Sequence, residues 1–322
     1  MDLQYLLLLQ QLRNWAGSFW TTLMLFISDF AIYGSVVLMI IIYWCLDRVQ
    51  GYWIITNCIS GFMINNFIKL TACVYRPWIR NPEITPPSGA LSSATGYSFP
   101  SGHTQFAVSF FGSVALYNRE KHPKLIIPCV ICTLLTAFSR NYLGVHTPQD
   151  VLISLFVGVV LLQVLAVIFD RVMAKPKRLT WCVIIFSVFT LLSALYFRLK
   201  LYPMHYLDGE LIVDPVRMAD DGYTACGLFL GFLVGALVEI RYVRFTVDGT
   251  RLRKVVRFLS GFVVPVLLLA VVKKPLYKLV GGSVGHIVLY FALSFYLVAV
   301  HPAIFMAVRR RTAPSDSGAA LH

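Results

Sequence analysis

Charged residues are scarce in this chain. Only 13% of its 322 residues are Asp, Glu, Lys or Arg, whereas 58% are hydrophobic and the mean hydropathy is +0.72. A soluble domain carries about a quarter charged residues, so the composition excludes an ordinary soluble globular fold. Apolar runs of about 20 residues recur along the chain, which is the length of a helix that crosses a bilayer. The sequence therefore predicts an all-α integral membrane protein, since helices satisfy the backbone within lipid.

Signals of export, glycosylation and metal binding are also missing. The opening stretch MDLQYLLLLQQLRNWAGSFW has an acid at position 2 and no basic region before its leucines, so we expect no cleavable signal peptide. No N-x-[ST] sequence occurs, which argues against a glycosylated surface protein. Nearly all seven cysteines lie within apolar runs, and no Cys or His set has metal-ligand spacing. We therefore expect no disulfide framework, no metal and no cofactor.

Nine apolar runs are long enough to be spanning helices. Residues 1–27 instead mix leucines with polar residues and then carry Trp15, Phe19 and Trp20, which predicts an interfacial amphipathic helix. We divide the rest into a transmembrane core at 28–197 and a C-terminal transmembrane extension with an acidic external loop at 198–322. The expected spans are 28–46, 51–74, 102–118, 124–143, 148–170, 179–197, 222–243, 255–275 and 284–307.

The net charge of +13 is unevenly placed along these spans. If the spans alternate in direction, most basic residues fall on one face, which we call the basic face. A nucleic-acid partner is therefore not needed to explain the charge. Cytoplasmic loops are rich in Lys and Arg, so this face and the C-terminus are predicted to be cytoplasmic and the N-terminus external. The basic segments of this face are Arg48, 119–124, 171–178, 241–257 and 309–311.

Two polar clusters fall on the opposite face. In KLTACVYRP, the K-x6-R spacing places Lys69 and Arg76 on one side of a helix, although two such cations also suit snorkelling to lipid headgroups. In GYSFPSGH, Ser101 is a candidate N-cap, and Gly102 lets a ligand approach the helix start. An ordinary capped helix with His103 in its first turn explains the second cluster equally well.

A third cluster, SRNYLGVHTPQD, falls on the same face. Thr147, Pro148 and Asp150 fit a capped helix start, where Asp150 also reaches the ring N–H of His146. A carboxylate in that place fixes the imidazole tautomer and makes the other nitrogen a better nucleophile or base. Capping alone explains three of these residues but leaves Arg140 and His146 without a role.

Together the clusters have the composition of a phosphoryl-transfer site. Lys69, Arg76 and Arg140 supply three cations, and the helix starts supply backbone donors, which suits the equatorial oxygens of a phosphoryl group. Two histidines, His103 and His146, allow one to attack and the other to protonate the leaving group. The combination points to metal-free hydrolysis of a phosphate ester.

The order and spacing of the three motifs resemble those of the type-2 phosphatidic acid phosphatase superfamily, in its membrane-integral lipid phosphatase branch. The haloperoxidase branch is disfavoured, because those relatives are soluble. The resemblance covers about residues 20–170 and implies a six-helix phosphatase core, followed here by about three further C-terminal transmembrane helices. The motifs are K-x6-RP at Lys69, Arg76 and Pro77; PSGH at Pro100 to His103; and SR-x5-H-x3-D at Ser139, Arg140, His146 and Asp150.

The resemblance also implies a role for each motif residue. His146 would attack phosphorus to form a phosphohistidine, Asp150 would orient its ring, and His103 would act as general acid and then as general base. No metal takes part in the family's mechanism, and vanadate should inhibit. The phosphate would be held by Lys69, Arg76, Arg140, Ser101 and Gly102.

The expected function is therefore hydrolysis of a lipid phosphate or diphosphate at the non-cytoplasmic face of the cell membrane. In a bacterium, undecaprenyl phosphates, phosphatidylglycerol phosphate and phosphatidate are the plausible substrates. Two alternatives remain open: a phosphatase for a water-soluble ester such as a sugar phosphate, and a non-catalytic lipid transporter or scaffold. The added C-terminal spans also offer a surface for a homodimer.

Overall fold

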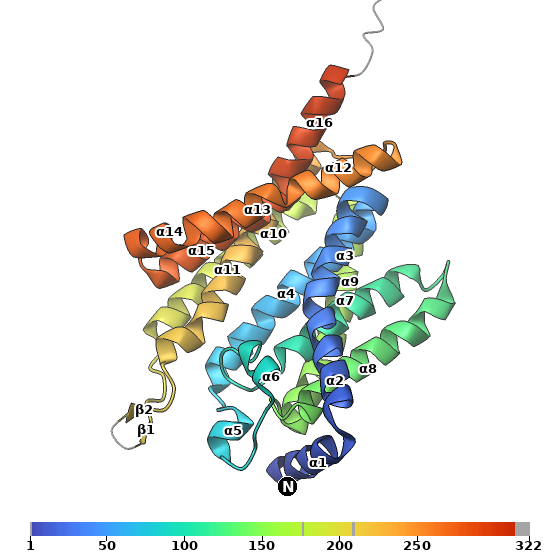
Figure 1. The fold of residues 1–322 in the computed structure, drawn as a ribbon. Coiled ribbons are helices and arrows are strands. Elements are labelled where there is room, and N and C mark those ends of the chain that lie inside the picture. The colour runs from blue at the N-terminus through green and yellow to red at the C-terminus, as the bar shows by residue number, and fades with distance from the viewer. Residues whose placement is uncertain (1, 176, 208–209, 313–322) are drawn as a thin grey trace, which may run out of the picture.

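The computed structural model describes residues 2–175, 177–207 and 210–312, and most of them are helical (Figure 1). The strands β1 (Tyr206–Leu207) and β2 (Glu210–Leu211) form a short antiparallel hairpin, which is the one sheet in this part of the chain. The expected all-α membrane fold is thus confirmed.

Eight helices in the described ranges are long and apolar enough to cross a membrane. Several of these spans contain short π-helical segments between their α-helical segments. In the first span, η1 (Phe30–Gly34) precedes α3 (Ser35–Ile41) and η2 (Ile42–Leu46) follows it. The eight spans are Ser18–Leu46, Arg48–Arg80, Pro123–Tyr142, Pro148–Ala174, Lys177–Leu199, Pro215–Val243, Arg251–Val280 and Gly282–Val308.

The remaining expected span, 102–118, is a shorter helix at the centre of the core. It forms α7 (Gly102–Asn118), whose 17 residues contact α4 (Arg48–Ala72), α8 (Ile126–Tyr142) and α9 (Pro148–Ala174). The short turn η3 (Pro123–Leu125) leads from α7 into α8. Because other helices surround α7, its buried face carries polar residues that a lipid-facing helix would not tolerate, and its first residue lies at the site described below.

The first span begins earlier than the sequence predicts. Helix α1 (Asp2–Ala16) ends at Gly17, whose φ of 84° breaks the helix, and α2 (Ser18–Asp29) starts the span at once rather than near residue 28. The buried guanidinium of Arg13 donates to the carbonyls of Tyr142 (3.1 Å) and Thr85 (2.6 Å). These bonds hold α1 across the end of the bundle where the motifs lie (Figure 1).

The chain between α4 and α7 closes that same end of the bundle. Cys73, in the left-handed region at φ 51°, ends α4, and two short helices follow, α5 (Pro77–Arg80) and α6 (Ser88–Ser92). The segment 95–100, which we call the carbonyl strap, then runs back toward the start of α7. It is tied to the end of α4 by a bond from the Ser98 amide to the Val74 carbonyl (2.7 Å).

Two helices of the extension pack against each other through close backbone contact. In α11 (Pro215–Val238), Gly227, Gly231 and Gly235 form a GxxxGxxxG stripe against α15 (Gly282–Phe295). A Cβ on Gly227 would lie 2.5 Å from the carbonyl oxygen of Ile287, so only glycine permits this approach of the two backbones. The other helices are α10 (Lys177–Leu199), η4 (Glu239–Val243), α12 (Arg251–Gly261), α13 (Val263–Leu267), η5 (Leu268–Val272), α14 (Lys273–Val280), η6 (Tyr296–Val300) and α16 (His301–Thr312).

The three expected C-terminal spans are confirmed, at Pro215–Val243, Arg251–Val280 and Gly282–Val308. Residues 313–322 of the expected C-terminal domain, and Asp208 of its acidic loop, lie outside the described residues. The boundaries of the three domains and the homodimer stay predictions.

Candidate active site

The structure brings all three motifs together at one end of the helical bundle. Nη1 of Arg76 lies 3.0 Å from Nε2 of His146, which joins the first motif to the third. The Ser101 amide donates to the Asp150 carbonyl (3.1 Å), which joins the second motif to the third. His103, on the first turn of α7, interacts electrostatically with Arg140, His146, Arg76 and Lys69. Residues from α4, α7, α8 and α9 therefore form one cationic site.

A capping box holds the carboxylate of the third motif. Thr147 caps α9, its hydroxyl accepting from the Asp150 amide, while Oδ2 of Asp150 accepts from the Thr147 amide at 2.8 Å. The same oxygen accepts from Oγ of Ser98 (2.6 Å) and lies 3.4 Å from Nδ1 of His146. The carboxylate is thus held by the Thr147 amide and the Ser98 hydroxyl in addition to its contact with the imidazole.

These contacts set the state of the His146 ring. A proton on Nδ1, directed at Asp150, leaves the lone pair on Nε2, which is the nitrogen that faces Arg76. The His146 side chain is buried, and the side-chain amide of Asn141 donates to the backbone carbonyl of His146 at 2.9 Å. Burial, together with the positive charge of Arg76, lowers the pKa of His146 well below its usual value. The imidazole is therefore neutral near pH 7, as a nucleophile must be.

Two of the cations are held by backbone carbonyls rather than by acidic side chains. Nζ of Lys69 donates to the carbonyls of Tyr97 (2.7 Å) and Pro100 (3.1 Å). Arg76 donates to the strap carbonyls of Thr95 (2.5 Å) and Gly96 (3.1 Å), and to Val145 at 3.0 Å. Both side chains are about 4% exposed. Carbonyls orient a cation without cancelling its charge, so the site keeps a positive potential.

Gly96 is needed within the strap. Its φ of 66° belongs to the left-handed region, and a Cβ there would lie 3.4 Å from Cδ of Lys69. Glycine lets the strap turn tightly enough to direct successive carbonyls at both cations.

Arg140 is the least satisfied cation of the site. Its guanidinium is 1% exposed, and Nη1 donates to Oγ of Ser28 at 2.5 Å. Nε and Nη2 are buried and meet no hydrogen-bond partner within the described ranges. A buried cation with free donors is costly unless an anion completes it, and a planar guanidinium suits a phosphate.

The start of α7 supplies further donors. Ser101 is its N-cap, as predicted, and its hydroxyl accepts from Oγ of Thr104 at 3.0 Å. Gly102 faces the side chain of Asn65, because a Cβ on Gly102 would lie 3.6 Å from Oδ1 of Asn65. Free amides at this end of a helix favour an anion.

Three further residues at the site lie outside the three motifs. Asn65 stands one turn before Lys69, and both polar atoms of its buried amide lack a partner among the described residues. Ser98 supports the carboxylate of the third motif from outside that motif. Asp221, in the extension, accepts from Oγ of Thr95 at 2.7 Å and so reaches the carbonyl strap.

Two other acidic residues of the extension make contacts outside the motifs. Asp214 caps α11 through the Val216 amide (2.9 Å), and Asp220 lies 3.6 Å from Nε2 of His286. Across residues 2–175, 177–207 and 210–312, no group of three His, Cys, Asp or Glu side chains is placed to hold a metal ion. The metal-free mechanism stays a prediction.

Comparison with known proteins finds two family matches along the chain. The PAP2 superfamily matches residues 50–174, and the transmembrane extension of PAP2 superfamily phosphatases matches residues 223–313. The undecaprenyl-diphosphatase BcrC of Bacillus subtilis is 34% identical over 145 residues, which are 44% of this chain and 70% of that protein. Phosphatidylglycerophosphatase B of the same organism is 32% identical over 29% of this chain and 48% of its own length.

A third relative, phosphatidylglycerophosphatase B of Haemophilus influenzae, is 41% identical over 66 residues, 19% of this chain and 27% of that protein. No solved structure gives a significant match. The first family match, over residues 50–174, contains the positions of all three motifs, and the second overlaps the last three spans. The chain therefore belongs to the PAP2 superfamily, as a membrane phosphatase that carries the transmembrane extension.

Proposed function

We propose that the protein is a metal-independent phosphatase that removes phosphate from lipid phosphates or lipid diphosphates through a phosphohistidine on His146. One observation carries the proposal: a buried, neutral imidazole oriented by Asp150 faces a set of cations held by carbonyls. Two relatives are named for lipid substrates, an undecaprenyl diphosphate and a phosphatidylglycerophosphate, and this supports a lipid as the leaving group here.

Substrate binding would rearrange one hydrogen bond. Nη1 of Arg76 now lies against Nε2 of His146, the nitrogen that must attack. An arriving phosphate offers that N–H a charged acceptor, which forms a stronger bond than an imidazole nitrogen. Arg76 then turns to a phosphate oxygen and frees the Nε2 lone pair, while the unpaired donors of Arg140 and the Lys69 ammonium bind the remaining oxygens.

Hydrolysis then takes two steps. Nε2 of His146 attacks phosphorus, the P–N bond forms, and the bond to the leaving oxygen breaks as His103 gives that oxygen a proton. Asp150 stabilises the positive charge that develops on the ring of His146. In the second step His103 accepts a proton from water, the water oxygen bonds to phosphorus, the P–N bond breaks, and inorganic phosphate leaves.

The site is proposed to open on the non-cytoplasmic side, with the C-terminus in the cytoplasm. The motifs lie at the end of the bundle that holds α1, and the basic loops lie at the other end, which the loop-charge rule assigns to the cytoplasm (Figure 1). Single cysteines at Lys121 and Val216, labelled in intact cells by an impermeant reagent, test this. Labelling at Val216 alone is expected, and labelling at Lys121 alone would reverse the orientation.

A phosphate-release screen of the purified protein tests the reaction. It compares prenyl and diacyl lipid phosphates, their diphosphates and water-soluble sugar phosphates, each with and without EDTA. Phosphate release from lipid substrates at the same rate with and without EDTA supports the proposal. If sugar phosphates are the best substrates, the protein is instead a phosphatase for water-soluble esters. His146→Ala should abolish release and the acid-labile phosphoenzyme, and His122→Ala, at an exposed histidine of the basic face, is the matched control. Full activity in His146→Ala would refute the mechanism.

A further inference from the structure

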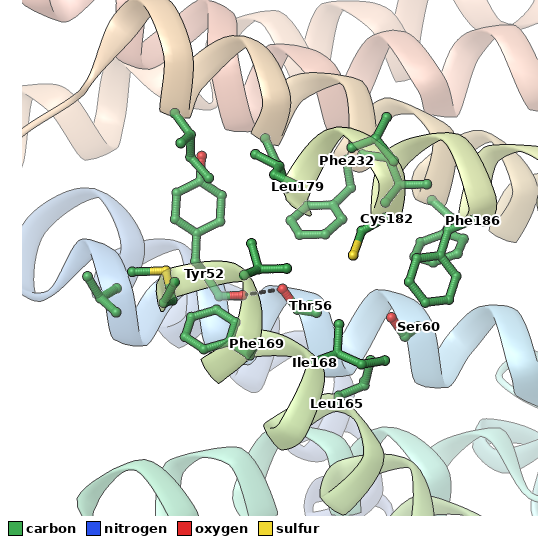
Figure 2. Close-up of a pocket in the computed structure, with 18 of the residues that line it drawn as sticks. Tyr52, Thr56, Ser60, Leu165, Ile168, Phe169, Leu179, Cys182, Phe186 and Phe232 are labelled. Atoms are coloured by element: carbon green, nitrogen blue, oxygen red, sulfur yellow. Dashed lines mark hydrogen bonds between the residues drawn. The ribbon is translucent and has the colours of Figure 1, made fainter. Parts of the chain in front are cut away.

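A cavity lies in the other half of the membrane, away from the motifs. It encloses about 390 Å³ between α4, α9 and α10 of the core and α11 of the extension (Figure 2). Its lining runs along α4 from Arg48 to Ser60, whereas Lys69 is at the far end of that helix. The cavity and the candidate active site therefore occupy opposite leaflets.

The walls of this cavity are apolar and aromatic. Phe169, Phe186 and Phe232 face the space from three different helices, and Leu165 and Ile168 lie on the same helix as Phe169 (Figure 2). The hydroxyl of Thr56, on the same wall, donates to the Tyr52 carbonyl at 2.7 Å and so offers no hydrogen to an occupant. Such walls suit a hydrocarbon chain, because a polar ligand would lose its hydrogen bonds to water there.

The mouth of the cavity is cationic. Arg48 pairs with the buried Glu239 at 2.7 Å, and its Nε meets no partner within the described part of the chain. Glu239 is itself saturated, since it also accepts from the Tyr52 hydroxyl and the Phe245 amide, each at 2.7 Å. The exposed side chain of Arg244 makes no hydrogen bond or ion pair with any described residue, so its charge is uncompensated.

Arg244 ends the helical turn η4 at this mouth. Its φ of 50° lies in the left-handed region that is common at the C-terminus of a helix, and its amide donates to the Glu239 carbonyl at 2.8 Å. The lining of the cavity includes Met173 and Ile240, which lie close in the chain to the basic residues Arg171 and Arg241, so the surroundings favour an anion as well.

We propose that this cavity binds one acyl chain of an anionic diacyl phospholipid, with the lipid phosphate between Arg244 and Arg48. The depth fits: the lining of α4 from position 48 to 60 extends about 18 Å at 1.5 Å per residue, and one leaflet of the hydrocarbon core is about 15 Å thick. Basic pockets between transmembrane helices commonly bind anionic lipid headgroups. The bound lipid would join the core to the extension, in the leaflet opposite the catalytic one.

Native mass spectrometry of the purified protein tests this proposal. Phosphatidylserine and phosphatidylcholine with the same acyl chains are titrated in detergent, because both are diesters and neither is a substrate for a monoester phosphatase. One phosphatidylserine should bind in preference to phosphatidylcholine. Arg244→Ala should reduce the preference about fivefold, the effect of one basic residue near a lipid surface. Arg251→Ala, another exposed arginine of the basic face, should leave it unchanged.

Filling the cavity provides a second test. Cys182→Trp places an indole in the space and should abolish retention of the lipid, whereas Ile185→Trp, on the outer surface of the same helix, should not. If Cys182→Trp fails to fold, the native thiol serves as the probe: phosphatidylserine should slow its modification by a small methanethiosulfonate and leave that of Cys132 unchanged. No preference for phosphatidylserine, equal effects of the two arginine variants, or no protection of Cys182 would each overturn the proposal.

Discussion

The contact between the extension and the carbonyl strap leads to a quantitative prediction. Asp221 on α11 accepts a hydrogen bond from Thr95 at 2.7 Å, and the carbonyls of Thr95 and Gly96 hold the guanidinium of Arg76. Asp221→Ala removes the support of the strap without touching a motif residue. The strap should then become mobile, and Arg76 should spend less time in the orientation that transition-state binding requires.

The size of the effect follows from the type of bond. A hydrogen bond to a charged group contributes about 1.5–3 kcal/mol, and the lower end applies because Asp221 and Thr95 are partly open to solvent. If the whole contribution appears in the transition state, kcat/KM falls about tenfold, since 1.4 kcal/mol corresponds to a factor of ten. Asp221→Asn keeps a neutral acceptor and should lose about threefold, because neutral hydrogen bonds are about half as strong.

Phosphate release from the best lipid substrate, with vanadate affinity as a second measurement, checks this prediction. Vanadate binding should weaken in parallel with kcat/KM, whereas a general loss of stability would lower the active fraction and leave the affinity of the rest unchanged. Asp220→Asn is the matched control, because it removes the same charge from the adjacent position, which contacts His286 instead of the strap. Equal kcat/KM in Asp221→Ala and the wild type would refute the coupling of extension and site.

Three further predictions concern packing, ionisation and the carboxylate support. Gly231→Val should lower the thermal unfolding midpoint of the purified protein by several degrees, because a Cβ there meets the Phe291 carbonyl, and Gly282→Ala, in open space, should not. Because the pKa of His146 is depressed in the folded state, only the unfolded state binds a proton on this ring as the pH falls through about 6.5. The free energy of unfolding of the wild type should therefore fall by about 1.4 kcal/mol for each pH unit below that value, and an equal fall in a His146→Gln variant would contradict the assignment to His146. Ser98→Ala removes a 2.6 Å bond to the carboxylate of Asp150 and should lower kcat/KM about tenfold in the phosphate-release assay; an unchanged value would exclude a positioning role.

The local features of the site were predictable because each depends on a few neighbouring residues. The capping box of Thr147 and Asp150 and the N-cap at Ser101 follow from side-chain chemistry at a helix start, and the structure confirms both. The common location of the motifs followed from alternation of the spans, which requires only that each apolar run crosses the membrane once. The short α7 preserves this alternation.

The features that the sequence did not reveal depend on how distant helices pack. Nothing near Asp221 indicates that its carboxylate meets Thr95, because the contact joins α11 to a segment far away in the chain. The start of the first span was wrong for another reason: Trp15, Phe19 and Trp20 are typical of an interface, and the break depends instead on the backbone of Gly17. The cavity opposite the site likewise involves four helices and no motif.

The carbonyl strap has a consequence for how this protein tolerates mutation. Its ligands to Lys69 and Arg76 are main-chain oxygens, which every amino acid possesses. A side-chain replacement that keeps the backbone path should therefore leave these bonds in place, whereas adding or deleting a single residue would shift all the carbonyls out of register. In a library of variants, the length of this segment should be more constrained than its composition, apart from Thr95, Gly96, Ser98 and Pro100, whose side chains or backbone angles have roles of their own.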